Sequence, residues 1–257
     1  MNIARRASWL NRGAVFIGPL ALLAVWAWVT RRPSADGART LVSPGQVVSA
    51  VRELLASGQL LHHLRGSPLR LAAGFGCGAG LGLLFGLLMG LSRTADEVCG
   101  PLFNAVRQVP SIAFIPMMIL IFGIEETFKI VVVAKASFYP VALAASDGVR
   151  NIPRGWLEVG RVYGLRGLTL GRSILLPAML PGLVTGVRIA LGRSWTVLVA
   201  AEIIASESGL GQMMEMGRQT MRQDVVLVGV FLTGLFGFLL DRSMRLAERH
   251  LARWRTA

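Results

Sequence analysis

The sequence predicts an all-α integral membrane protein with about six transmembrane helices. Hydrophobic residues make up 53% of the 257 residues and charged residues only 16%, whereas a soluble domain usually carries about 25% charged residues. The mean hydropathy of +0.58 is correspondingly high. The net charge is +13, but the arginines lie mainly between apolar runs, a pattern that encodes membrane topology rather than a nucleic-acid-binding face. We therefore expect the chain to contact membrane lipid and no nucleic acid.

Six apolar runs predict six spans, because a helix needs about 20 mostly apolar residues to cross the hydrocarbon core. The first run is Ala14–Thr30, for which a cleaved signal peptide is the alternative because arginines precede it. The other five runs are residues 71–92, 101–122, 128–146, 180–204 and 225–240.

An even number of spans places both termini on one side of the membrane. Connections on the side of the N-terminus would hold fourteen arginines and those on the other side seven. Because basic residues accumulate in cytoplasmic connections, this bias favours cytoplasmic termini. The chain then divides into an N-terminal segment with the first span (1–40), a periplasmic amphipathic segment (41–68), a membrane core (69–245) with a long cytoplasmic loop (147–178), and a basic cytoplasmic tail (246–257).

The second apolar run carries a glycine at every fourth position. Four residues advance a helix by little more than one turn, so these glycines share one face. Small residues that let two backbones approach closely mark helix–helix contacts in lipid. We expect this face to pack tightly against another helix; it consists of Gly74, Gly78, Gly82, Gly86 and Gly90.

The segment between the first two spans has the signals of an amphipathic helix at the outer surface. Ser43 is the expected N-cap, Pro44 the first helical residue, and Gln46 the partner that completes a capping box. Apolar residues follow at helical spacing, and Gly58 is the expected stop.

The connection from residue 147 to 178 is too long for a simple turn. Residues 156–162 can form a short helix, Gly164 can adopt the left-handed conformation that ends it, and a second short helix can run to Pro177. The result is a cytoplasmic helix–turn–helix knob that could transmit a movement from a soluble partner to the membrane helices.

This connection resembles the cytoplasmic coupling loop of permease subunits of bacterial ABC importers. The family motif is Glu-Ala-Ala, three residues, Gly, nine residues, then Ile-x-Leu-Pro, and in this chain Val159 and Gly160 replace the two alanines. The resemblance assigns ATPase coupling to the matching residues, which are Glu158, Gly164, Ile174, Leu176 and Pro177.

Further matches extend the resemblance from about Leu41 to the end of the chain. Residues 107–110 (Arg-Gln-Val-Pro), 150–153 (Arg-Asn-Ile-Pro), 201–204 (Ala-Glu-Ile-Ile) and 208–211 (Ser-Gly-Leu-Gly) are similar to the aliphatic sulfonate, taurine and nitrate branch, and alkanesulfonate permeases are the most similar of these. The resemblance implies a type I ABC importer transmembrane domain in the bacterial inner membrane. It also implies three kinds of partner: a second copy of the chain, two ATP-binding subunits that hold ATP and Mg, and a periplasmic or lipid-anchored solute-binding protein.

Charged residues inside the spans are candidates for the translocation pathway or its gate. A charge in the hydrocarbon core is costly and normally faces the bundle interior or water. The candidates are Arg107, Arg188, Arg193 and Glu202. They could form a positive pathway for an anionic solute, or they could brace the bundle. Since related permeases share several of these charges whatever their solute, bracing or gating is favoured for those, whereas Arg193 matches no motif and is the better candidate for solute-dependent chemistry.

Two other classes of protein fit the sequence less well. An ion-coupled secondary transporter usually shows internal repeats, and none is visible. A membrane enzyme needs paired carboxylates or a His/Cys cluster at one depth, and Cys77 and Cys99 have no metal-site spacing. The chain has no phosphate-binding loop, so we expect a non-catalytic subunit without cofactor or metal of its own. The resemblance implies a small anionic solute, with an aliphatic sulfonate as the first expectation and taurine or nitrate next. Bicarbonate or an uncharged pyrimidine precursor also fits the sequence.

Overall fold

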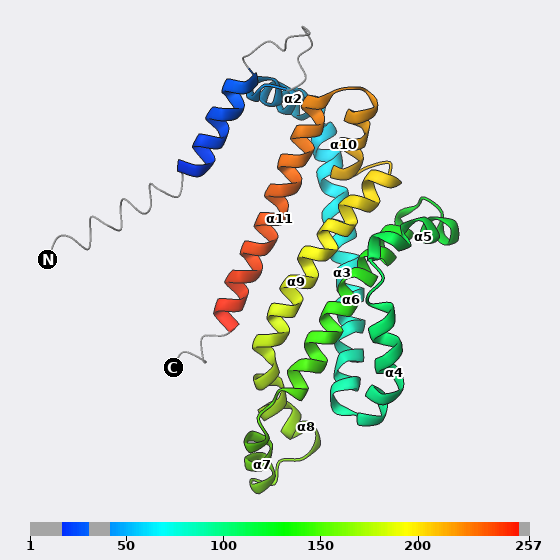
Figure 1. Cartoon of the computed structure of the whole chain (residues 1–257), viewed down its shortest axis with the longest axis vertical. Helices are drawn as coiled ribbons and strands as arrows, with labels where there is room; N and C mark the ends of the chain where they lie inside the picture. Colours follow the sequence, from blue (N-terminus) through cyan, green and yellow to red (C-terminus); the bar gives the residue numbers. More distant parts are fainter. Residues whose placement is uncertain (1–16, 31–41, 252–257) are drawn as a thin grey trace, which may run out of the picture.

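The structure, a computed structural model, describes residues 17–30 and 42–251, and within these residues every regular element is helical. An apolar helix, Ile17–Thr30, precedes the helices labelled in Figure 1. The elements that follow are α2 (Pro44–Ala56), α3 (Gln59–Leu91), α4 (Arg93–Val106), the 3-10 helix η1 (Ser111–Phe114), α5 (Ile115–Phe122), α6 (Glu126–Arg150), α7 (Arg154–Val162), α8 (Gly167–Leu170), the π-helix η2 (Gly171–Leu175), α9 (Leu176–Ile204), α10 (Leu210–Gln219) and α11 (Gln223–Leu251).

Four helical stretches are long and apolar enough to cross a membrane, and a bent pair makes a fifth candidate. The four are α3, α6, residues 167–204 and α11. In Figure 1 they run along the long axis, with α2 and α10 at one end and α7 and α8 at the other. These are called the α10 end and the α7 end below. Of the first expected span, Ala14–Thr30, residues 14–16 lie outside the described part of the chain.

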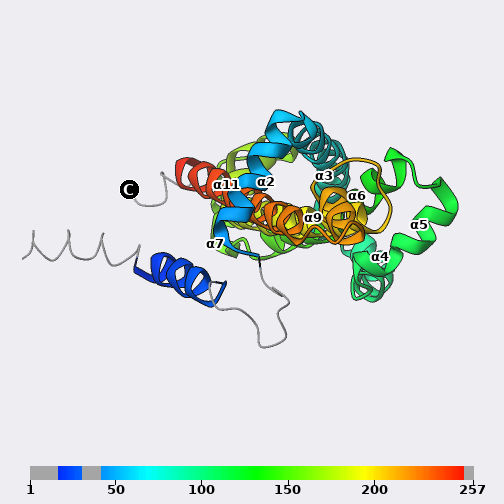
Figure 2. The ribbon, with the colours of Figure 1, turned by 90° about the horizontal axis from the view of Figure 1, so that it is seen from above.

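The expected third span, residues 101–122, is not one continuous helix but part of the bent pair that makes the fifth candidate. The chain bends by 83° between α4 and the η1–α5 segment. Pro110 lies at the break. Proline has no N–H to donate and disfavours helical conformation in the preceding residue, here Val109. Figure 2 shows the consequence, since α5 projects sideways from the bundle.

Two other span boundaries also differ from expectation. Helix α3 begins at Gln59 rather than Leu71, so it includes both Pro68 and Arg70. Helix α11 continues to Leu251, so the expected tail begins as an extension of that helix. Both differences add polar residues to helices whose apolar parts had been identified from the sequence.

Helices α3 and α6 lie unusually close together along the glycine stripe. A methyl group added at any of the five glycines would lie within 3.0 Å of an atom of α6. At Gly82, for example, it would lie 2.5 Å from the carbonyl oxygen of Phe138. The absence of side chains on this face therefore sets the distance between the two helices.

Helix α2 begins as the sequence predicts. Ser43 accepts a hydrogen bond from the Gln46 amide, and the Gln46 side chain accepts one from the Ser43 amide, which confirms the capping box. Gly58, with φ of 74°, separates α2 from α3, which confirms the expected stop. Val47 and Leu54 are buried in the same hydrophobic cluster as residues of α9, α10 and α11. The apolar face of α2 thus covers the α10 end of the bundle.

Candidate functional site

The knob at the α7 end is built on a left-handed glycine. Helix α7 ends at Val162, and Gly164 has φ of 70°. The Leu165 amide donates to the Gly160 carbonyl at 2.9 Å and the Gly164 amide to the Arg161 carbonyl at 3.0 Å. This is the Schellman arrangement, which closes a helix and reverses the chain when a residue with positive φ follows its last turn. The predicted short helix and its glycine turn are confirmed.

Gly160 allows α7 to pack closely against α8 and η2. A methyl group at this position would lie 2.6 Å from Ile174 Cδ1 and 2.8 Å from Leu170 Cδ1. Val159, which replaces the other alanine of the motif, is instead 55% exposed and does not pack the knob. The π-helix η2 then leads directly into α9, which carries Leu176 and Pro177 in its first turn.

The surface of the knob is apolar for a segment that lies outside the bundle. Its exposed large apolar side chains are Trp156, Val159, Val162, Tyr163, Leu168 and Leu176. Glu158, which lies in α7, is also exposed. Exposed apolar groups that are clustered rather than scattered mark interaction surfaces.

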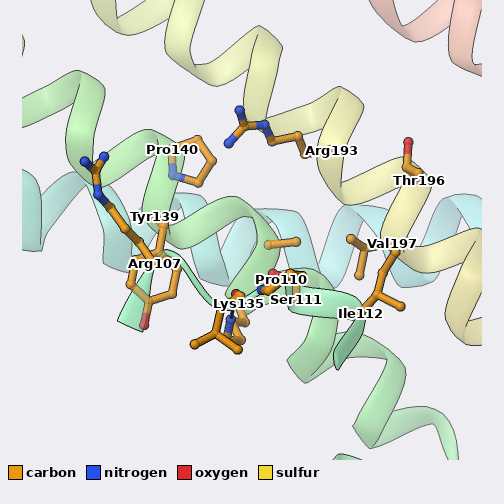
Figure 3. Close-up of a pocket in the computed structure, with 12 residues that line it drawn as sticks. Arg107, Pro110, Ser111, Ile112, Lys135, Tyr139, Pro140, Arg193, Thr196 and Val197 are labelled. Atoms are coloured by element: carbon orange, nitrogen blue, oxygen red, sulfur yellow. Dashed lines mark hydrogen bonds between the residues drawn. The ribbon is translucent and has the colours of Figure 1, made fainter. Parts of the chain in front are cut away.

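A second feature is a cavity of about 350 Å³ among α4, α6, α9 and η1. Arg107, Lys135 and Arg193 all line it, and its lining includes no Asp or Glu. In Figure 3, Arg107 and Arg193 lie on opposite sides of Pro140. The bend at Pro110 produces this arrangement, because it ends α4 and turns η1 across the cavity.

The three cations of the cavity differ in how they are held. The Lys135 Nζ atom lies 4.0 Å from the centre of the Phe114 ring and 3.4 Å from the Val109 carbonyl oxygen. Among the described residues, Arg107 and Arg193 have no hydrogen-bond or ion-pair partner. Lys135 is therefore fixed by a cation–π contact, whereas the two guanidinium groups keep their donors available.

Glu202 lies in a separate cluster at the α10 end and does not reach the cavity. It is fully buried, and its carboxylate accepts hydrogen bonds from Ser67 at 2.8 Å and from the Gly211 amide at 3.1 Å. Arg70 Nη1 lies 3.0 Å from Glu202 Oε1. Arg70 also donates to the Ser208 carbonyl at 2.7 Å. The cluster joins α3, α9 and the loop before α10.

Glu126 and Lys129 complete this cluster at the start of α6. Arg70 Nη2 donates to Glu126 Oε1 at 2.7 Å, and Lys129 Nζ lies 2.8 Å from the same oxygen. Two cations and two carboxylates thus neutralise each other. Arg70, Glu126 and Lys129 were not among the charged residues singled out from the sequence, whereas Glu202 was. A single arginine directly before an apolar run was the available signal.

Arg188 lies nearer the α7 end and is also paired. Its Nη1 lies 2.7 Å from Glu248 Oε2, and its Nε lies 3.6 Å from Asp241 Oδ1. The Thr185 hydroxyl donates to Glu248 at 2.7 Å. These contacts link α11 to α9. Of the four charged residues singled out from the sequence, the structure thus brings only Arg107 and Arg193 together.

The described residues offer no candidate metal site. Over residues 17–30 and 42–251, no three His, Cys, Asp or Glu side chains are grouped so that they could hold a metal ion. His63, which lies in α3, accepts a hydrogen bond from the Gly209 amide at 3.2 Å and so serves the α10 end of the bundle.

The membrane-spanning helices enclose charged groups, and an exposed apolar knob lies at one end of the bundle. This combination is typical of a transmembrane subunit of a transport complex. The family described as binding-protein-dependent transport system inner membrane component matches residues 78–253, and the chain belongs to this family. The chain is 40% identical to the aliphatic sulfonates transport permease protein SsuC of Escherichia coli (strain K12), over 97% of this chain and 94% of that one. It is 33% identical to the taurine transport system permease protein TauC of the same organism, over 98% and 94% of the two chains.

Solved structures agree on the fold. A chain of the MetNI methionine ABC transporter in an inward-facing crystal form has a TM-score of 0.60 at 23% identity, covering 73% of this chain and 95% of that chain. The fold is that of a type I ABC importer transmembrane domain. The chain is therefore a multi-pass permease subunit of an ABC importer, a membrane component rather than a catalytic enzyme.

Proposed function

We propose that this permease subunit carries an aliphatic sulfonate, with taurine as the next candidate, across the inner membrane. The observation that carries the proposal is the 40% identity to SsuC over nearly the whole of both chains. The second relative named above, TauC, is named for taurine, which is also a sulfonate. The cations of the cavity suit a solute with a permanent negative charge.

The proposed complex contains two copies of this chain, two ATP-binding subunits and an external solute-binding protein. The knob would dock into a groove of each ATP-binding subunit, because its exposed Trp156, Tyr163 and Leu168 need a partner surface. ATP and Mg would be held by those subunits, since this chain has no phosphate-binding loop. Closure of the ATP-binding subunits would move the knobs and switch the access of the pathway.

The proposed orientation places the α7 end in the cytoplasm. Arg154, Arg161, Arg166 and Arg172 all belong to this end, and basic residues accumulate on the cytoplasmic side. Both termini would then be cytoplasmic, and α2 and α10 would face the solute-binding protein.

The test is reconstitution of the native complex. The tagged chain is purified from mildly solubilised membranes, copurifying subunits are identified by mass spectrometry, and the complex is placed in proteoliposomes with the solute-binding protein outside. We expect uptake of labelled ethanesulfonate that requires ATP inside the vesicles and stops with a non-hydrolysable analogue. A chain that purifies alone and moves solute without ATP would instead be a secondary transporter. ATP-driven uptake of nitrate but not of ethanesulfonate would refute the proposed solute.

A further inference from the structure

We propose that the cavity lined by Arg107, Lys135 and Arg193 is an anion subsite inside the permease, which holds the sulfonate group of the solute during its passage. The inference rests on the proposed function and adds the residues that recognise the solute within the membrane.

The first argument is the depth of the cavity. Lys135 lies nine residues from the start of α6 and Arg193 eleven residues from the end of α9. At a rise of about 1.5 Å per residue, they lie roughly 14 and 17 Å from the α10 end of their helices, which is near the middle of a bilayer. Unpaired cations at this depth are costly unless they face water or an anion.

The second argument is the contrast with other cations in the same spans. Arg70, Lys129 and Arg188 each lie within ion-pair distance of a carboxylate. Bundle bracing therefore uses paired charges in this protein. Arg107 and Arg193 lack such partners among the described residues and instead border an open cavity. Three positive charges around one cavity without a carboxylate create a potential that favours an anion.

The third argument is the chemistry of the walls. Two guanidinium groups offer forked pairs of N–H donors, which suit a group with several equivalent oxygens. Thr196 also borders the cavity, and Ile112 and Val197 supply apolar surface. A charged head with a short alkyl tail fits this combination better than a wholly polar anion. The volume of about 350 Å³ lies within the range of small-molecule sites.

The test measures equilibrium binding of labelled ethanesulfonate to the purified permease–ATPase complex without the solute-binding protein, so that only a site in the complex is detected. We expect saturable binding that weakens about 10-fold or more in Arg107→Gln and in Arg193→Gln, because each loses a charge-assisted contact. Arg193→Lys keeps the charge and should bind better than Arg193→Gln. The matched control is Arg52→Gln, an exposed arginine of α2 outside the cavity, which should bind as the unchanged complex does.

Uncharged dimethyl sulfone provides the second arm. It should not compete with ethanesulfonate, since the subsite selects negative charge. Competition at similar concentrations, or binding of unchanged strength in both Gln variants, would overturn the subsite while ATP-driven uptake by the unchanged complex still supports the proposed function. Absence of ethanesulfonate uptake by the unchanged complex would overturn the proposed function and the subsite together.

Discussion

Arg70 and Glu202 form an ion pair that is buried at the α10 end of the bundle, with 3.0 Å between Nη1 and Oε1. The side chain of Glu202 is fully buried and that of Arg70 is 7% exposed. Each partner also has other hydrogen bonds, from Ser67 to Glu202 and from Arg70 to the Ser208 carbonyl. The pair therefore links α3 to α9 and to the loop before α10, and its charge is balanced locally.

Breaking this pair should destabilise the protein strongly. Arg70→Met leaves a carboxylate buried without its counter-charge, which typically costs about 3–5 kcal/mol. We expect a clear fall in the thermal unfolding temperature of the detergent-solubilised protein. Glu207→Gln is the control, since Glu207 lies in the loop before α10 that Arg70 contacts but is itself exposed. Equal unfolding temperatures for the two variants would contradict a stabilising role for the pair. In the double variant Arg70→Met/Glu202→Leu, part of the stability should return, because no uncompensated charge remains.

The glycine stripe should be sensitive to position rather than to glycine content. A methyl group at Gly78 would overlap the Ala134 carbonyl and the Ser137 side chain, whereas at Gly80 it would meet nothing within 4 Å. Gly78→Ala should therefore destabilise by about 1–3 kcal/mol through overpacking. Gly80→Ala should be neutral or stabilising by up to about 1 kcal/mol, because alanine is the better helix former. Thermal unfolding of the two variants measures the difference, and similar values would show that α3 and α6 can separate without cost.

Much of the fold follows from local sequence signals. The capping box at Ser43, the stop at Gly58 and the turn at Gly164 each depend on residues close in the sequence, so they could be predicted. The face of α3 that packs on α6 could also be predicted, because the glycine spacing defines it. The identity of the partner helix could not, since nothing in the stripe specifies α6.

The charged sites show where such reasoning ends. Arg70 marked the apparent edge of an apolar run, and only the fold reveals that Glu126 and Glu202 neutralise it within the span. Arg188 and Arg193 lie five residues apart on one helix, yet one is paired with α11 and the other borders the cavity. Which arginine has a partner depends on contacts more than 50 residues away in the chain.

The pair Glu53–Arg222 should give a weak dependence of stability on pH. Two hydrogen bonds of 2.7 Å from Arg222 hold the pKa of Glu53 below its ordinary value. A carboxyl group with a lowered pKa in the folded state contributes stability above its unfolded pKa of about 4.3 and loses it as pH falls through the folded value. The unfolding temperature of the native protein should therefore slightly exceed that of Glu53→Gln at pH 7. The difference should shrink as the pH falls below about 4.3 and vanish once the pH lies below the folded-state pKa of Glu53. A difference that grows on acidification would contradict this assignment.

Gly164 provides a test of coupling that does not depend on packing. A side chain at this position would meet nothing within 4 Å, but the φ of 70° is strained for residues other than glycine. Gly164→Val should therefore disturb the turn of the knob alone, since a β-branched residue disfavours positive φ. We expect normal membrane insertion, together with ATP hydrolysis that no longer responds to solute-loaded binding protein and with loss of uptake. Both activities are measured in proteoliposomes that contain the whole complex.

Two matched variants separate the conformation of Gly164 from the bulk of the new side chain. Gly164→Asn should retain most coupling, because asparagine adopts left-handed conformations more readily than valine does. Gly155→Val, in the first turn of α7, adds the same side chain at a site with open space and no positive φ, and it should leave solute-stimulated hydrolysis largely intact. If Gly164→Val keeps normal solute-stimulated hydrolysis, the knob does not transmit the movement of the ATP-binding subunits. If all three variants lose it equally, the surface of the knob matters rather than its turn.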